Sequence, residues 1–175
     1  RASGFARFRQ LVAGTDERVL AVQRPHDIAV DRMNRVYLTD GSRRQVLVFD
    51  PTVRAAKPIG TEGAGRLVKP MGLAIDEKDN LYVADQGGKR VVAFAPSGAF
   101  VRAYGGARGL INPVDVAVDT AAGIVWVVDS YLHEVLGYRR ADGVLLHRIG
   151  KHESDVADKQ NRTADRVVAT HGGDD

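Results

Sequence analysis

The sequence contains three copies of one unit, and this repeat constrains the fold more than any other feature of the chain. Each copy opens with a proline, carries an aspartate after each of its first two apolar runs, and closes with a glycine. These landmarks fall at Pro25, Pro70 and Pro113; at Asp31, Asp76 and Asp119; at Asp40, Asp85 and Asp129; and at Gly60, Gly105 and Gly150. A period of 43–45 residues at all four landmarks is typical of β-propeller blades, each of which is a four-stranded sheet.

The second copy shows how one blade is built. Its apolar runs "MGLAID", "LYVAD", "RVVAFA" and "AFVRAYG" are separated by the polar turns "DEKDN", "QGGK" and "PSG". Continuous apolar runs such as "LYVA" indicate a sheet that is covered on both faces. We therefore predict an all-β chain with blades at about 25–60, 70–105 and 113–150, and with first strands near residues 26–31, 71–76 and 114–119.

The six repeated aspartates precede turns, where a carboxylate accepts backbone N–H groups. We therefore interpret them as structural residues and not as a calcium site. The chain has 175 residues, 44% of them hydrophobic and 27% charged, and its net charge of +3 is too small to require a nucleic-acid partner. It contains no cysteine, which excludes disulfides and thiolate metal sites. No apolar run approaches the roughly 18 residues of a membrane span, so no membrane insertion is predicted.

The three units resemble NHL repeats. The resemblance depends on the openings "PHDIAVD", "PMGLAID" and "PVDVAVD", on second strands such as "VYLTD" and "LYVAD", and on the third strands "VLVF", "VVAF" and "VLGY". It covers residues 25–150. The family usually places asparagine and then Arg–Ile after the second aspartate; here only Arg90 fits the arginine position, with Gln45 and Glu134 in the other copies.

The resemblance implies a ring of six blades, which would need about 260 residues at this period. We expect residues 1–150 to form half of such a ring, with a leading strand at 4–13, and residues 151–175 to form a polar linker or tail. We expect further chain or a second subunit to complete the ring. The chain alone should then associate, and Trp126, Val128 and Leu136 should not all be exposed in the intact particle.

Binding residues of propellers lie on loops around the channel mouth. In this chain, the loops before the first strands and between the second and third strands share that face. His26 occurs once, where the other copies have Met71 and Val114, so the fold does not require it. Asp27 and Asp115 begin strands that line the channel and could hold a cation or a water molecule, whereas their counterpart in the second copy is Gly72.

The placement of His26 is similar to that of the metal-binding histidines of peptidyl-hydroxyglycine lyases, and "DSYLHEV" resembles one of their loops, with His133 near the channel mouth. A catalytic zinc needs about three protein ligands, and this chain offers one residue of the right kind at the right position. We therefore treat His26 as a rim residue first and as a metal ligand second. No cofactor is predicted, and a metal ion in the central channel is left open.

The second-to-third strand loops supply the other candidates. Arg43, Arg44, Lys89 and Arg90 form a basic strip on neighbouring loops, with Gln86 beside it. NHL propellers that bind RNA use basic loops on this face together with aromatic residues for stacking. Tyr131 is the loop aromatic here, and Glu134 interrupts the pattern in the third blade.

These features favour a non-enzymatic recognition or assembly scaffold whose partner is another protein. A metal-dependent lyase-like enzyme is the first alternative, and an RNA-binding module is the second. The sequence leaves the compartment open, and a periplasmic or extracellular location is the preferred expectation.

Overall fold

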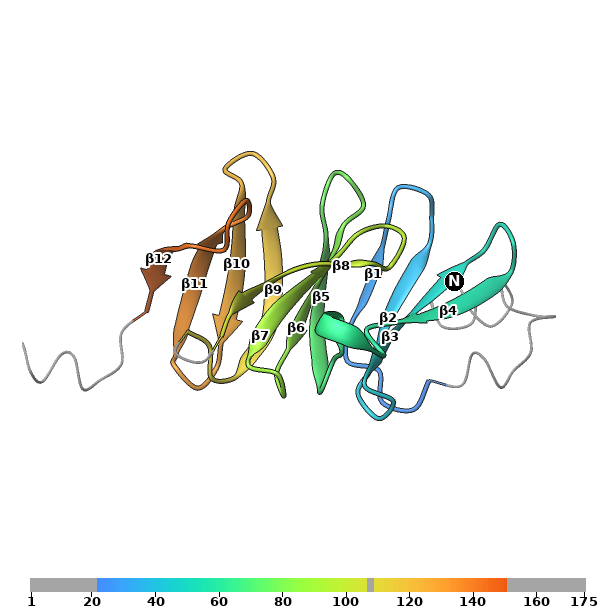
Figure 1. Ribbon diagram of the computed structural model, residues 1–175, viewed down its shortest axis with the longest axis horizontal. Helices are drawn as coiled ribbons and strands as arrows, with labels where there is room; N and C mark the ends of the chain where they lie inside the picture. The colour runs from blue at the N-terminus through green and yellow to red at the C-terminus, as the bar shows by residue number, and fades with distance from the viewer. Residues whose placement is uncertain (1–21, 107–108, 151–175) are drawn as a thin grey trace, which may run out of the picture.

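The computed structural model describes residues 22–106 and 109–150, and these residues form three four-stranded antiparallel sheets (Figure 1). Within each sheet, the strands are paired in chain order. The strands are β1 (Ile28–Val30), β2 (Val36–Asp40), β3 (Gln45–Asp50), β4 (Ala55–Ile59), β5 (Pro70–Ile75), β6 (Leu81–Asp85), β7 (Arg90–Phe94), β8 (Phe100–Gly105), β9 (Pro113–Asp119), β10 (Ile124–Asp129), β11 (Glu134–Arg139) and β12 (Leu145–Ile149). A short 3-10 helix, η1 (Gly63–Gly65), lies between β4 and β5. The predicted all-β fold and its three blades are confirmed.

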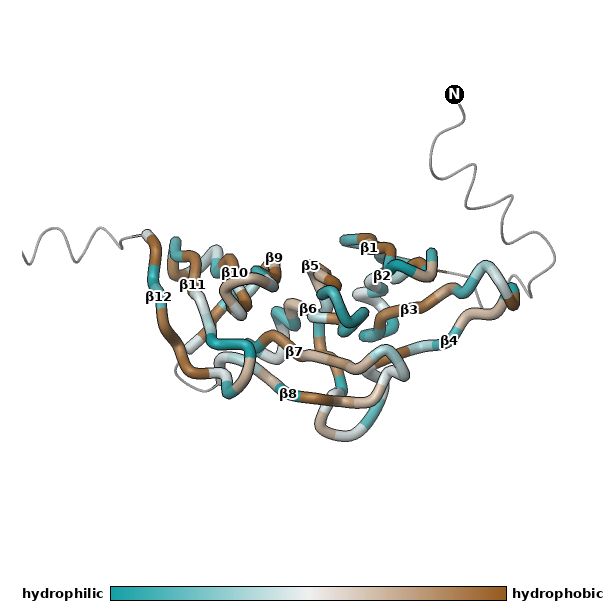
Figure 2. Tube along the Cα trace, turned by 90° about the horizontal axis from the view of Figure 1, so that it is seen from above, coloured by the Kyte–Doolittle hydropathy of each residue, from teal (hydrophilic) through white to brown (hydrophobic). Residues whose placement is uncertain are grey.

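The three sheets are arranged like the blades of a fan. In the view from above, β1, β5 and β9 lie close together along one side, whereas β4, β8 and β12 spread away from each other (Figure 2). This is the geometry of propeller blades around an axis, with the first strand of each blade innermost. The predicted leading strand at 4–13 and tail at 151–175 lie outside the described residues.

The boundaries of the first strands agree with the prediction to within about two residues. β1 is the shortest, and its register with β2 begins at Ile28 opposite Leu38. The N–H groups of His26 and Asp27 instead donate to Thr39 Oγ1, at 3.1 and 2.9 Å. A side-chain hydroxyl thus satisfies the backbone groups that precede the strand.

The repeated aspartates have the structural role that was predicted for them. Asp31 Oδ1 accepts the N–H groups of Met33 and Arg35, both at 2.9 Å, and Asp76 Oδ1 accepts those of Lys78 and Asn80 at the same distance. Each carboxylate thereby closes the turn between the first and second strands of its blade.

Two apolar clusters hold the blades together, one at each junction between neighbours. Tyr37 and Val48 of the first blade pack against Val83 and Phe94 of the second. The opposite face of the second blade packs against the third in the same way. All five residues of β6 are buried, which confirms that its continuous apolar run belongs to a sheet covered on both faces.

The third blade has one covered face and one free face. Val125, Val127, Leu136 and Tyr138 face the second blade and are buried. The free face of the third blade consists of Trp126, Val128, Val135, His147 and Ile149. Leu136 thus lies in the core, Trp126 is half-buried, and Val128 and Ile149 are 39% and 57% exposed.

The free face of the third blade repeats a surface that is buried elsewhere in the molecule. Counted from the aspartate that ends the second strand of each blade, Trp126 and Val128 correspond to Tyr82 and Ala84 of the second blade. Both counterparts are buried against the third blade, Tyr82 at 3% exposure and Ala84 at 0%. The free face therefore has the side-chain pattern of a junction between blades.

Charged groups join the blades on the upper face of Figure 1, where the turns between the first and second strands lie. Arg140 of the third blade pairs with Glu77 of the second, with Nη1 2.9 Å from Oε2, and lies 3.3 Å from Asp76 Oδ2. Thr120 Oγ1 donates to the same Glu77 carboxylate at 2.9 Å. The hydrogen bonds from Arg140 have the largest effect, and together with the bond from Thr120 they lower the pKa of the Glu77 carboxyl group to about 2.

We predict that acidification weakens the junction between the second and third blades through Glu77. Its folded pKa lies below the ordinary value of 4.5, so its stabilising contribution is present above about pH 4.5 and is lost as the pH falls toward 2. Urea unfolding at about pH 5, 4 and 3 gives the free energy of unfolding at each pH. Between about pH 5 and pH 3, this free energy should fall less in Glu77→Gln than in the wild type. Glu62→Gln, which changes an exposed glutamate that pairs with no cation of residues 22–106 or 109–150, should leave the pH dependence unchanged. Equal profiles for all three proteins would contradict the prediction.

Candidate functional site

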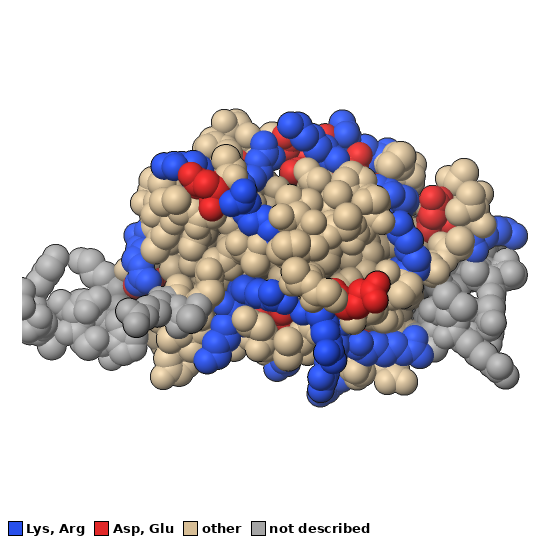
Figure 3. All heavy atoms as spheres, in the orientation of Figure 1, with Lys and Arg blue, Asp and Glu red and all other residues tan. Residues whose placement is uncertain are grey.

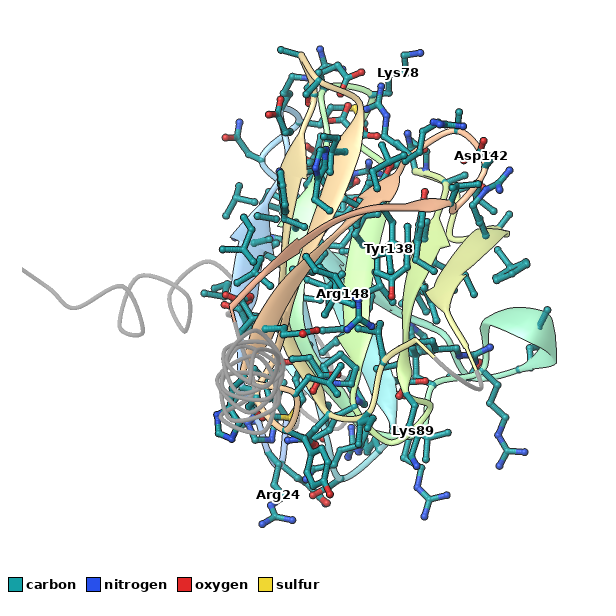
Figure 4. The ribbon with its side chains drawn as sticks, turned by 90° about the vertical axis from the view of Figure 1, so that its left-hand side faces the viewer. Arg24, Lys78, Lys89, Tyr138, Asp142 and Arg148 are labelled. Carbon is teal, nitrogen blue, oxygen red and sulfur yellow. The ribbon has the colours of Figure 1, made fainter. Side chains whose placement is uncertain are left out.

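The lower face of Figure 1 consists of the loops that enter the first strands and the loops that join the second and third strands. These are residues 22–27, 60–69 and 109–112, and residues 41–44, 86–89 and 130–133. In the side view, Arg24 and Lys89 lie at this end of the sheets, whereas Lys78 and Asp142 lie at the opposite end (Figure 4). The lower face therefore contains the loops that the sequence indicated as the binding surface.

Each blade ties its two lower loops together with the aspartate at the end of its second strand. Asp85 Oδ1 accepts the N–H groups of Val68 and Lys69 at 2.9 and 2.8 Å, and Asp129 Oδ2 accepts those of Ile111 and Asn112 at 2.7 and 2.9 Å. These carboxylates are fully buried. They are therefore occupied in holding the loops and are not available to a ligand.

A backbone bond completes the link between the two loops of each blade. The N–H of Gly41 donates to the carbonyl of Arg24 at 3.0 Å, that of Gln86 to Lys69 at 2.9 Å, and that of Ser130 to Asn112 at 3.1 Å. The residue that precedes each landmark proline is therefore fixed at the surface. Arg24 and Lys69 occupy this position in the first two blades, and Asn112 occupies it in the third.

The last residue of each second-to-third strand loop has a left-handed backbone. Arg44, Lys89 and His133 have φ values of 57°, 52° and 54°. This conformation favours glycine or asparagine, because a Cβ atom crowds the following carbonyl group. The turn itself thus gains nothing from a long cationic side chain at Arg44 or Lys89.

Exposed cations dominate the lower face. They are Arg24, Arg43, Arg44, Arg66, Lys69 and Lys89. Figure 3 shows Lys and Arg side chains along this edge of the molecule. Arg43 Nε lies 4.0 Å from Asp40 Oδ2, and among the described residues the other five form no ion pair. The basic strip was predicted from Arg43, Arg44, Lys89 and Arg90, and the exposed cations of this face also include Arg24, Arg66 and Lys69.

Arg90 differs from the other predicted cations. Its guanidinium group donates to the carbonyl oxygens of Ala64 and Arg66, at 3.1 and 2.8 Å, and its Nε lies 3.5 Å from Asp85 Oδ2. Arg90 therefore holds the loop between the first and second blades, and its bonds leave it little freedom to bind a partner.

The third blade contributes apolar groups to the lower face. Tyr131 is 64% exposed and Ile111 is 39% exposed, and Val68 of the second blade is 45% exposed. Val68 lies against Gly87, where an added Cβ would come within 2.7 Å of Val68 Cγ1. Tyr131, which was predicted from the sequence, is therefore accessible to a partner because of its exposure. Gln86, another predicted residue, is half-buried, and its backbone N–H donates to the carbonyl oxygen of Lys69.

The two predicted aspartates at the inner rim differ in their bonding. Asp27 Oδ2 accepts the N–H of Leu73 at 2.7 Å, and this bond joins the first blade to the second. Asp115 Oδ1 accepts the N–H of Val116 in its own strand at 2.9 Å and lies over Gly72. An added Cβ on Gly72 would meet Asp115 Oδ1 at 2.4 Å, so the second blade has no room for a side chain at this position.

The histidines His26 and His133 are exposed and belong to blades that are not neighbours. The ring of His26 lies beside the backbone of Gly41. Within residues 22–106 and 109–150, no group of three histidine, aspartate or glutamate side chains could hold a metal ion. In the same ranges, no helix is long and apolar enough to span a membrane.

The upper face has a cavity of about 320 Å³ between the first and second blades. Among its lining residues are Asp31, Asp76 and Asp79. Each of these carboxylates forms an ion pair: Asp31 with Arg35 at 2.6 Å, Asp76 with Arg140 at 3.3 Å and Asp79 with Arg32 at 3.2 Å. The charges of the cavity are thus neutralised within the molecule, unlike those of the lower face.

Comparison with solved structures shows that this arrangement is that of β-propellers. Virginiamycin B lyase from Staphylococcus aureus is similar over 72% of this chain and 41% of its own, with 10% identity and a TM-score of 0.59. A chain of a nidogen/laminin complex is similar over 76% of this chain and 49% of its own, with 19% identity and a TM-score of 0.62. The chain spans less than half the length of each.

The class of blade follows from the sequence comparison. The family model of the NHL repeat matches residues 22–49, which contain β1, β2 and most of β3. The predicted resemblance to NHL repeats is thus confirmed by a family match at residues 22–49. A search of curated proteins gives no match to the chain.

Proposed function

We propose that this chain is part of a non-enzymatic scaffold that binds a partner protein through the lower face of its blades. The observation that carries this proposal is the set of exposed cations on the lower loops, of which Arg43 alone has a carboxylate partner, Asp40, within the part of the chain that the structure describes. A rigid sheet that presents exposed loops is a common platform for recognition, because little ordering is needed on binding. The similarity to a chain of the nidogen/laminin complex supports a role in assembly.

A metal-dependent lyase is the second candidate, because His26 is exposed at the rim and two of the similar folds are lyases. This candidate requires about three ligands. Calorimetric titration with zinc separates the two functions: tight binding that is lost in His26→Ala would favour the lyase, whereas the scaffold needs no metal.

Site-directed crosslinking tests the scaffold. The chain has no cysteine, so a single cysteine can direct a photoactivatable group to one position. We expect Ser42→Cys on the lower face to crosslink a partner protein from the source organism, and Ala121→Cys on the upper face to give no such product. The captured protein should then bind the unlabelled chain after purification. Equal capture from both faces, or no binding by the purified protein, would contradict the proposal.

A further inference from the structure

The lower face has a strong imbalance of accessible charge. Six cations are exposed there, and Glu62 is the exposed carboxylate among the described residues of these loops. The buried carboxylates Asp85 and Asp129 accept backbone N–H groups of the same loops. On the upper face, Arg32, Arg139 and Arg140 form ion pairs, whereas the exposed cations Arg54 and Lys78 form none with the described residues.

The cations of the first two blades occupy equivalent positions. Arg24 and Arg44 flank the lower loops of the first blade, and Lys69 and Lys89 flank those of the second. The backbone of each pair is fixed by the bond between the entry loop and the second-to-third strand loop. The pattern of charge is thus repeated along neighbouring blades and suits an extended anionic chain that crosses both.

The third blade ends this pattern. Asn112 and His133 occupy its equivalent positions, and the amide of Asn112 donates to Ser130 Oγ at 2.6 Å. The exposed apolar side chains here are Tyr131 and Ile111, which lie beside the exposed polar residues Ser130 and His133. The lower face therefore changes from basic on two blades to apolar on the third.

We infer that the lower face binds an acidic protein segment whose glutamates or aspartates lie on the first two blades and whose apolar end lies on the third. Single-stranded RNA fits the surface less well, because such binding relies on aromatic side chains that stack successive bases among the cations. In the described loops, the exposed residue of the Phe, Tyr and Trp type is Tyr131, which lies on the blade without the cations, and the exposed ring among the cations is the single imidazole of His26. This inference rests on the proposed function and specifies the chemistry of its partner.

Fluorescence anisotropy with two labelled probes tests the inference. One probe is a twelve-residue peptide of ten glutamates followed by leucine and phenylalanine, and the other is a twelve-nucleotide oligouridylate. We expect the peptide to bind more tightly than the oligouridylate at about 50 mM NaCl. Its affinity should fall as salt rises, because exposed charges are screened.

A matched pair of variants separates charge from folding. Arg44→Gly with Lys89→Gly removes two lower cations and places glycine where the backbone is left-handed, so it should preserve or raise stability. We expect this variant to bind the peptide about tenfold more weakly, since each exposed pair contributes up to about a factor of five. The control is Arg54→Gly with Lys78→Gln, which removes two exposed cations from the upper face, one of them also at positive φ. The control should bind as the wild type does.

Three outcomes would overturn the inference: tighter binding of the oligouridylate, no binding of the peptide, or equal loss in both variants. The first would favour a nucleic-acid partner. The second would leave the scaffold standing if Ser42→Cys still captured a protein, because the partner would then use a segment that is not acidic. Failure of both experiments would remove the scaffold as well.

Discussion

Gly72→Asp should destabilise the chain by more than about 3 kcal/mol, although it makes the second blade match the other two at this position. An added Cβ would lie 2.8 Å from the Cα of Asp115 and 3.0 Å from the carbonyl oxygen of Val114. Both are backbone atoms and cannot rotate away, so the junction between the second and third blades must open. Overpacking alone costs about 1–3 kcal/mol, and a second carboxylate beside Asp115 adds repulsion and desolvation.

Urea unfolding monitored by circular dichroism measures this effect. Gly72→Ala should show the overpacking part alone, about 1–3 kcal/mol. Gly41→Ala is the matched control, because its added Cβ would meet the ring of His26, an exposed side chain, at 3.3 Å and should cost less than about 1 kcal/mol. Unchanged stability of Gly72→Asp would show that the blades are not packed as described.

The free face of the third blade should cause the isolated chain to associate. Val128 and Ile149 are exposed on it, although their counterparts in the second blade are buried against a neighbour. Burying a branched aliphatic side chain contributes about 1.5–3 kcal/mol. Val128→Lys with Ile149→Lys should therefore weaken association by about two to four powers of ten.

Sedimentation at several concentrations, from about 1 to 100 μM, shows the difference directly. The wild-type chain should form dimers or larger species in this range, and the double variant should remain monomeric. Val53→Lys, which changes a valine that is 67% exposed on an upper loop, should associate as the wild type does. A wild-type chain that stays monomeric and unfolds cooperatively would contradict the prediction.

The fold was predictable because its signals are local and repeated. The aspartates that close turns, such as Asp31 and Asp76, bond to residues two and four positions away, and their spacing locates the strands. The ion pair between Arg140 and Glu77 was not predictable, because it joins residues 63 positions apart through the packing of two blades. No spacing rule in the sequence specifies such a pair.

The candidate site was predicted in part. The lower loops and their cations Arg43, Arg44 and Lys89 were identified from the order of strands alone. Arg24 and Lys69 were missed, although a cation directly before a landmark proline was a visible signal in two copies. Arg90 was grouped with the binding residues because a sequence does not show the carbonyl groups that its guanidinium contacts.

The fit of Gly72 between the aspartates of its neighbours also restricts how many blades a closed ring can have. Asp27 bonds to the residue after Gly72, and Asp115 fills the space in which a side chain at Gly72 would lie. Large and small residues thus alternate from one first strand to the next. A ring that keeps this alternation throughout has an even number of blades, because an odd number would place two aspartates or two glycines side by side at one junction.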